Sequence, residues 1–258
     1  MSTLYTIENI DLELVSAIPS RFRAIAIIAP KDLIPPNQIA KLDAYYNTGG
    51  KIMLNLNRVN GDLQAKRGIS ITTGLENWLQ NKGIEIENSF LVDASSGSIT
   101  VQQRQDTLGV NTPMEFPFFP LISTFSDHPI TTGLAQITMP FASPIQYTGD
   151  TTTTFVPIAF SSNKSGTIKP PIDFDMQKNW AAVNFSSANL VVGGVLENKT
   201  TGSKLVIFGD GDFATSGQLG SQQTDNSNLI VNCMDWLSDE TGLFILRNKR
   251  FSLNPPNY

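Results

Sequence analysis

The stretch that decides the fold is Lys204–Trp236, which reads KLVIFGDGDFATSGQLGSQQTDNSNLIVNCMDW. It opens with Leu205–Phe208, and a short run of β-branched and aromatic residues predicts a buried strand. The strand ends in GDGD, and apolar residues at helical spacing predict a helix from Asn226 onward. Ligands of open α/β sheets bind beyond the carboxyl ends of the strands. Asp210 and Asp212 therefore occupy the place where such a protein carries its site.

The N-terminal part of the chain predicts a strand–helix–strand unit. Ala24–Ala29 is an apolar strand stopped by Pro30, and Lys51–Leu56 is the next strand. Between them, a helix begins near Pro35 and Pro36 and ends at two glycines. Such a unit makes a right-handed crossover between parallel strands, so we expect a sheet that is at least partly parallel.

The rest of the chain predicts one α/β domain over residues 1–258, with a β-rich insertion or side sheet at about 94–200. In chain order the expected elements are a loop (57–72), a helix (73–82), an extended segment (84–92) that ends in Asp93, strands (180–185 and 190–196) and a short extended piece (243–245). Residues 113–120, PMEFPFFP, contain three prolines, which exclude a regular helix or central strand. We interpret Phe116, Phe118, Phe119 and Phe125 as core residues or an interface strip.

Composition excludes several classes of protein. The net charge is −5 and the basic residues form no long run, which argues against nucleic acid or anionic lipid as a partner. The single Cys233 excludes an internal disulfide and a multi-cysteine metal site. No apolar stretch reaches the ~18 residues of a membrane span, and the N-terminus has no signal-peptide pattern. The sequence fits a soluble chain, or equally a fragment between membrane anchors.

Two places could carry chemistry. His128 is the only histidine and lies in SDHPIT, where a turn is favoured over a catalytic base. Asp210 and Asp212 could bind a divalent cation, but the neighbouring Gly209 and Gly211 favour a tight turn. The GDGD sequence matches neither an EF-hand nor a phosphate loop, and no nucleophile elbow is present. We expect no catalytic set, metal or cofactor.

Four segments in order resemble the extracytoplasmic domain of the gliding-motility type (GldG-like) auxiliary proteins of ABC transporters. They are the strand–helix–strand unit (24–56), the segment after Gly83 that ends in Asp93 (84–93), PMEFPFFPLISTFSDHPITTG (113–133), and the strand, GDGDF and helix at 205–237. The resemblance implies a flavodoxin-like or glutamine-amidotransferase-like fold without the catalytic cysteine, with a partly parallel sheet and helices on both faces. It also implies ABC permease and ATPase subunits as partners, and a place on the periplasmic side of the inner membrane, held by anchors outside this chain.

The resemblance favours a non-enzymatic subunit that supports gliding motility or export. A second hypothesis is a carbohydrate- or peptide-binding module, in which Asn57, Asp93, Asp210, Asp212 and His128 line a site near the strand ends. The third hypothesis is a hydrolase that uses Asp210, Asp212 or His128 as acid or base, and it needs a partner group within reach of one of them.

Overall fold

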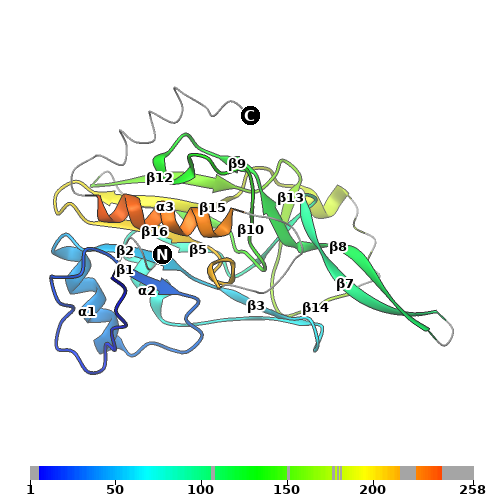
Figure 1. Ribbon diagram of the computed structural model, residues 1–258, viewed down its shortest axis with the longest axis horizontal. Helices are drawn as coiled ribbons and strands as arrows, with labels where there is room; N and C mark the ends of the chain where they lie inside the picture. Colours follow the sequence, from blue (N-terminus) through cyan, green and yellow to red (C-terminus); the bar gives the residue numbers. More distant parts are fainter. Residues whose placement is uncertain are drawn as a thin grey trace.

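The computed structural model describes residues 6–105, 108–149, 152–175, 178, 180, 182–215 and 225–239. Its centre is a six-stranded sheet in the order β1-β2-β16-β15-β12-β9 (Figure 1). These strands span Ile25–Ile28, Lys51–Asn55, Lys204–Phe208, Val191–Asn198, Thr153–Phe160 and Thr124–Phe125. The first three run parallel, as the strand–helix–strand unit predicts, and each later strand pairs antiparallel with its neighbour.

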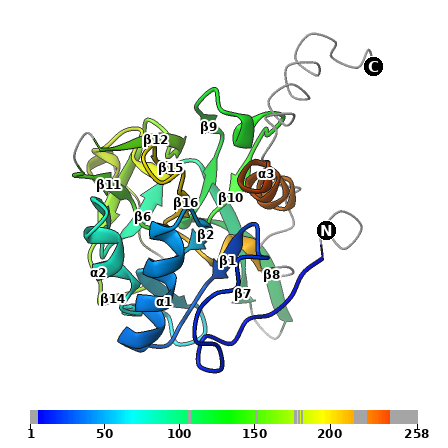
Figure 2. The same ribbon diagram turned by 90° about the vertical axis from the view of Figure 1, so that its left-hand side faces the viewer.

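Helices pack on both faces of the parallel part of the sheet. α1 (Pro36–Asn47) and α2 (Leu75–Gln80) bury their apolar sides with Ile52, Leu54 and Ile207 on one face. α3 (Asn226–Ser238) packs over the opposite face (Figure 2). α1 begins with Pro36 in its first turn and ends before Gly49, whose φ of +96° is strained for other residues.

Four smaller antiparallel sheets surround the central one in the described part of the chain, in the orders β10-β8-β7, β11-β5, β13-β6 and β14-β4-β3. Their strands are β3 (Val59–Asp62), β4 (Arg67–Ser70), β5 (Ile84–Ile86), β6 (Phe90–Asp93), β7 (Ser96–Gln105), β8 (Leu108–Ile122), β10 (Ile137–Thr138), β11 (Ile145–Tyr147), β13 (Ser165–Ile168) and β14 (Ile172–Asp173). Short 3-10 helices are η1 (Pro129–Thr131), η2 (Ala182–Phe185) and η3 (Asp212–Ala214).

The expectation of a flavodoxin-like or glutamine-amidotransferase-like α/β fold is wrong. The described residues form 16 strands but only three α-helices and three short 3-10 helices, so this part of the protein is β-rich. Among the described elements, a helix joins two neighbouring parallel strands only in the β1–α1–β2 unit. Elsewhere short turns join consecutive strands, and short turns produce antiparallel pairs, such as β15 with β16.

Three local predictions also fail. Residues 57–72, expected as a loop, contain the β3–β4 hairpin. The single extended segment at 84–92 is divided into β5 and β6, which belong to different sheets. Residues 182–185, expected as a strand, form η2. The extended piece expected at 243–245 lies outside the described residues.

The proline-rich segment 113–120 lies within β8 and forms a wide bulge. Ser96 pairs with Pro120 and Ser98 with Glu115, so residues 116–119 face the single residue Gly97. The bulge buries Phe116, Phe118 and Phe119 in a phenylalanine cluster, which confirms the core interpretation for these three rings. The same cluster contains Phe90, Phe141 and Phe174.

Candidate functional site

The polar cluster of the central sheet lies where β2 and β16 end. Asn57 follows β2, and its Oδ1 accepts a hydrogen bond from the backbone N–H of Gly211 at 2.5 Å. Asn57 Nδ2 donates to Asp212 Oδ2 at 3.1 Å. Asp210 Oδ1 accepts from the backbone N–H of Asp212 at 2.7 Å. The structure therefore brings together three of the five predicted site residues, and they hold the GDGD turn in shape.

Gly211 has no room for a side chain. A Cβ at this position would lie 2.6 Å from the Cα of Ala29, the residue that follows β1. Ala29 itself has a φ of +46°, which is unusual for a residue other than glycine. The ends of all three parallel strands thus meet at this turn.

Burial raises the pKa of both aspartates. Asp210 is fully buried, and desolvation followed by the charge of Asp212 raises its pKa well above the ordinary value. Desolvation also raises the pKa of Asp212, while the charge of Lys31 and the hydrogen bond from Asn57 oppose the shift. Asp210 is thus a neutral acid over a wider pH range than an exposed aspartate, and Asp212 is the half-buried member of the pair.

Asn55, at the end of β2, is a member of this cluster that the sequence analysis missed. Its side chain is fully buried, and neither amide atom has a hydrogen-bond partner among the described residues. Asp210 Oδ2 is also buried without a partner in that part of the chain. Asn55 is in register with Phe208 on β16, two residues before Asp210. A polar residue directly after the apolar run Ile52–Leu54 was the available signal.

Replacing Asn55 and replacing Asn57 by leucine are expected to change the stability of the protein in opposite directions. Asn55→Leu removes two buried, unbonded polar atoms, so we expect the free energy of unfolding to stay the same or rise by about 1 kcal/mol. Asn57→Leu leaves the Gly211 N–H unpaired, so we expect a loss of about 1–3 kcal/mol. Urea unfolding of both variants measures the difference. An equal loss in the two variants would contradict this account of the cluster.

Asp93 lies in a different sheet and is bonded locally. It is fully buried at the end of β6. Asp93 Oδ1 accepts from Ser162 Oγ at 2.6 Å and from the backbone N–H of Ser95 at 2.8 Å. Asp93 Oδ2 accepts from the backbone N–H of Ser162 at 2.7 Å. Its carboxylate fastens the turn before β7 to the segment after β12.

His128 caps the short helix η1. Its Nδ1 accepts from the backbone N–H of Ile130 at 3.2 Å, and its ring lies 5.4 Å from that of Trp236 on α3. Desolvation and then the charge of Lys204 lower the pKa of His128 to about 4. The ring is therefore neutral at neutral pH and bonded to the local backbone, in agreement with the turn interpretation.

His128 predicts a pH effect on stability. Because the pKa of His128 is lower in the folded chain than its ordinary value of 6.5, protonation favours the unfolded chain. Its contribution is present above pH 6.5 and is lost as the pH falls toward about 4. Asparagine keeps a hydrogen-bond acceptor at the cap but has no ionisable group. We therefore expect His128→Asn to reduce the decrease in unfolding free energy between pH 7 and pH 4 by roughly 1–2 kcal/mol. Thermal unfolding between pH 4 and pH 7 measures it, and an unchanged pH profile would contradict it.

The chemistry available at the polar cluster is limited. The one histidine and the one cysteine of the chain lie elsewhere, and Cys233 is buried with its pKa raised by desolvation. In the described part of the chain, no group of three histidine, cysteine or acidic side chains could hold a metal ion. Asp210 and Asp212 are engaged with the turn, so the arrangement suits a structural lock better than acid–base catalysis.

Comparisons with known proteins concern the whole chain. The profile of a family described as "ABC-type uncharacterized transport system" matches residues 1–233. A solved structure titled "mmIFT52 N-terminal domain" is similar in fold, with a TM-score of 0.54 and 14% sequence identity, and the match covers 84% of this chain and 78% of that one. No curated protein matches the chain.

Proposed function

Because the chain belongs to the family described as an ABC-type uncharacterized transport system, we propose that it is the extracytoplasmic domain of an auxiliary transporter subunit. In this proposal it acts by binding permease and ATPase-containing assemblies, in support of gliding motility or export, and not by catalysis. The family match over residues 1–233 carries the proposal. Among the described residues, no helix is long and apolar enough to cross a membrane. We also propose that anchors outside this chain hold it on the periplasmic side of the inner membrane.

The hairpin of β7 and β8 supports a role in protein contacts. From Ser98 and Glu115 outward the two strands pair only with each other among the described residues, and the ribbon projects from the body (Figure 1). A two-stranded ribbon is marginally stable alone, and its free edges can pair with another chain. We therefore assign the contact with a transporter subunit to this arm.

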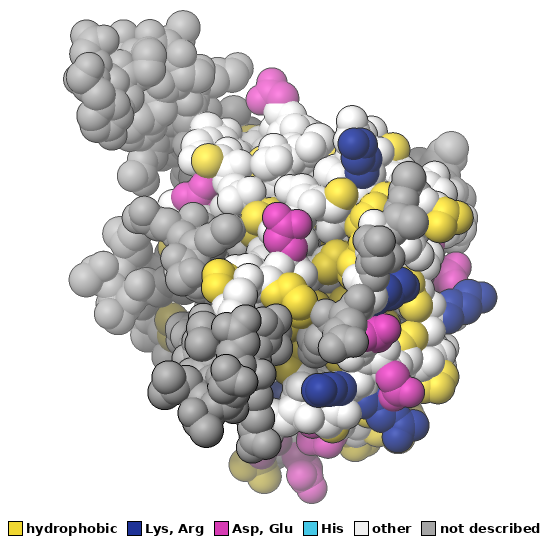
Figure 3. Space-filling model, turned by 90° about the vertical axis from the view of Figure 1, so that its right-hand side faces the viewer, with side chains coloured by type: hydrophobic (Ala, Val, Ile, Leu, Met, Phe, Trp, Pro, Cys, Tyr) yellow, Lys and Arg dark blue, Asp and Glu magenta, His cyan; other side chains and the backbone are white. Residues whose placement is uncertain are grey.

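The surface charge fits the same kind of partner. On the face shown in Figure 3, the described Lys and Arg side chains are interspersed with Asp and Glu and with hydrophobic groups. A nucleic-acid-binding face would instead gather basic residues. A mixed surface suits contact with another protein.

Affinity purification of the tagged full-length gene product from native membranes tests the proposal. We expect permease and ATPase subunits to co-purify after mild cross-linking. Replacing residues 101–112 by Asn-Gly shortens the arm and keeps its base, so it should lower the yield of both partners at least fivefold. The control is Val183→Ser, a residue that is 78% exposed on η2 and should change nothing. Absence of both subunits with the intact chain would overturn the proposal.

A further inference from the structure

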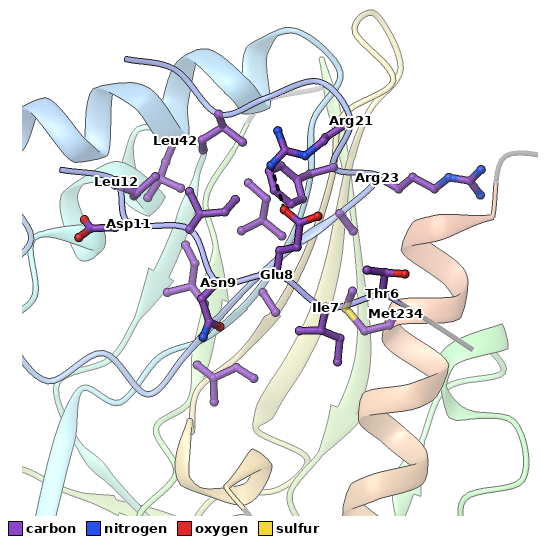
Figure 4. A pocket seen from close by; sticks show the side chains of 18 of the residues that line it. Thr6, Ile7, Glu8, Asn9, Asp11, Leu12, Arg21, Arg23, Leu42 and Met234 are labelled. Atoms are coloured by element: carbon purple, nitrogen blue, oxygen red, sulfur yellow. Dashed lines mark hydrogen bonds and ion pairs between the residues drawn. The ribbon is translucent and has the colours of Figure 1, made fainter. Parts of the chain in front are cut away.

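A groove runs along the free edge of β1, the first strand of the central sheet. It has a volume of about 1180 Å³, larger than the roughly 300–1,000 Å³ of typical small-molecule pockets. Leu42 of α1 and Met234 of α3 line it, and these two helices pack on opposite faces of the sheet. Residues 6–12 of the N-terminal segment line it as well (Figure 4). The groove therefore continues the sheet beyond β1, in the layer between the two helices.

Ala26 and Ile28 present unpaired main-chain groups to this groove. The backbone N–H of Ala29 donates to the carbonyl of Asn55, and alternate residues of a parallel strand bond to the same neighbour. The residues of β1 that alternate with Ala26 and Ile28 therefore bond to β2, whereas the N–H and C=O groups of these two point away from it. Within the described part of the chain, β1 pairs with β2 alone and no hydrogen bond reaches these outward groups.

The chemistry of this edge favours a polypeptide as the occupant. Ile28 is 39% exposed, and Ile7, which also lines the groove, is 67% exposed. An acyl chain or another wholly apolar ligand would cover these side chains but would leave the outward N–H and C=O groups buried without partners. An extended peptide bonds to those groups and packs apolar side chains against both helices. A second copy of this chain would bring its own residues 6–12 to the same edge, so the two segments would compete for one space.

The charged side chains of the groove indicate one further feature of the occupant. Glu8 Oε2 forms an ion pair with Arg21 Nη2 at 2.9 Å. Asp11 Oδ1 accepts a hydrogen bond from the backbone N–H of Glu13 at 2.8 Å. Arg23 also lines the groove, two residues before β1, and has no hydrogen bond or ion pair among the described residues. An acidic residue of the occupant complements this charge.

We propose that the groove binds an extended segment of another polypeptide as a seventh strand of the sheet, antiparallel to β1. Antiparallel pairs are slightly more stable per residue than parallel ones. Because helices cover both faces of this layer, the segment is continuously apolar over about four residues, the length of β1. Its apolar run ends beside the start of β1, so an Asp or Glu directly after the run faces Arg23. This inference depends neither on the β7–β8 arm nor on the proposed transporter role.

Amide hydrogen exchange on the full chain tests the site, with the synthetic peptide acetyl-TVIVIE-amide as the probe. We expect the peptide to slow exchange at Ala26 and Ile28 roughly tenfold or more, because both amides then donate to it. Met53 and Val206, inside the sheet, are the internal reference and should not change. Unslowed exchange at millimolar peptide would overturn the proposal. Protection without peptide, or protection that rises with protein concentration, would assign this edge to the chain itself or to a second copy and would also overturn it.

Two changes separate strand addition from the binding of apolar side chains alone. Methyl groups on the backbone nitrogens of the two valines block one edge of the peptide, and methyl groups on those of the two isoleucines block the other. One methylated peptide should bind roughly tenfold more weakly than the unmodified one, and the other should keep its affinity. Equal affinities of the two methylated peptides would contradict the added strand, and this comparison leaves the protein unchanged.

Ala26→Pro makes the matching change in the protein. It removes an outward N–H but no hydrogen bond between β1 and β2, and proline is tolerated at such a position of an edge strand. The variant should bind the unmodified peptide roughly tenfold more weakly. Thermal unfolding verifies that the variant is folded. A folded variant with unchanged affinity would contradict the hydrogen bond from Ala26.

A charge exchange tests the orientation of the strand. Arg23→Glu should weaken the binding of acetyl-TVIVIE-amide roughly fivefold, whereas acetyl-TVIVIK-amide should bind this variant more tightly than the wild type. Arg67→Glu, at an exposed position on β4, changes the net charge by the same amount and should leave both affinities unchanged. Fluorescence anisotropy of labelled peptides measures the affinities. Equal effects of Arg23→Glu and Arg67→Glu would overturn the antiparallel assignment.

Discussion

Replacing Phe90 by alanine is expected to lower the free energy of unfolding by about 3–5 kcal/mol. Phe90 is fully buried in β6, and its ring makes edge contacts with Phe118, Phe141 and Phe174 at centroid distances of 5.7, 5.9 and 5.9 Å. Truncation removes these contacts and leaves a cavity. The surrounding residues can fill this cavity only in part, because they belong to separate segments that other sheets hold in place.

Gly68 on β4 makes this site still less tolerant. A Cβ at Gly68 would lie 2.6 Å from the Phe90 ring, so the ring occupies the space left by the missing side chain. Urea unfolding followed by fluorescence measures the loss. Ile69→Ala is the matched control, because Ile69 is the next residue on β4 and is 44% exposed, and it should cost less than about 1 kcal/mol. The phenylalanine cluster contains residues from several of the small sheets. If Phe90→Ala lowers the free energy of unfolding no more than the control does, packing in this cluster does not stabilise the contact between those sheets.

The sequence predicts the parts of this fold that have strong periodicity. The β1–α1–β2 unit and the β16–α3 unit are recognisable because apolar runs are bounded by proline or glycine. The β3–β4 hairpin was missed because its short strands are polar and contain glycine. Those glycines provide space for the rings of Phe141 and Phe90, a role that depends on partners distant in sequence.

The candidate site divides in the same way. Asn57, Asp210 and Asp212 meet because neighbouring parallel strands end together, which sequence reasoning can anticipate. Asp93 does not join them, because β6 pairs with β13 in another sheet. That pairing depends on long-range contacts and leaves no local signature. The same limit applied to Asn55, whose burial follows from its position between β1 and β16.

Asp210→Asn is expected to raise the free energy of unfolding by roughly 1–3 kcal/mol near neutral pH. The amide oxygen of the variant can still accept the hydrogen bond from the N–H of Asp212, and the variant carries no ionisable group in the fully buried position. The sign follows from the raised pKa of Asp210. Above the ordinary pKa of 3.8 the unfolded chain has released this proton while the folded chain retains it. The contribution of Asp210 is therefore full below that pH and is lost as the pH rises toward its folded pKa.

Urea unfolding of the wild type and Asp210→Asn at pH 4, 6 and 8 tests this argument. The gain in stability of the variant should be small at pH 4 and should grow with pH. In the wild type, ionisation of Asp210 favours the unfolded chain more strongly as the pH rises, whereas the asparagine of the variant does not ionise. Asp32→Asn, at an exposed position after β1, is the control and should change stability by less than about 0.5 kcal/mol. If Asp210→Asn instead destabilises the chain most at pH 8, the ionised carboxylate is required there. The cluster would then have to be regarded as a charged site and not as a neutral lock of the turn.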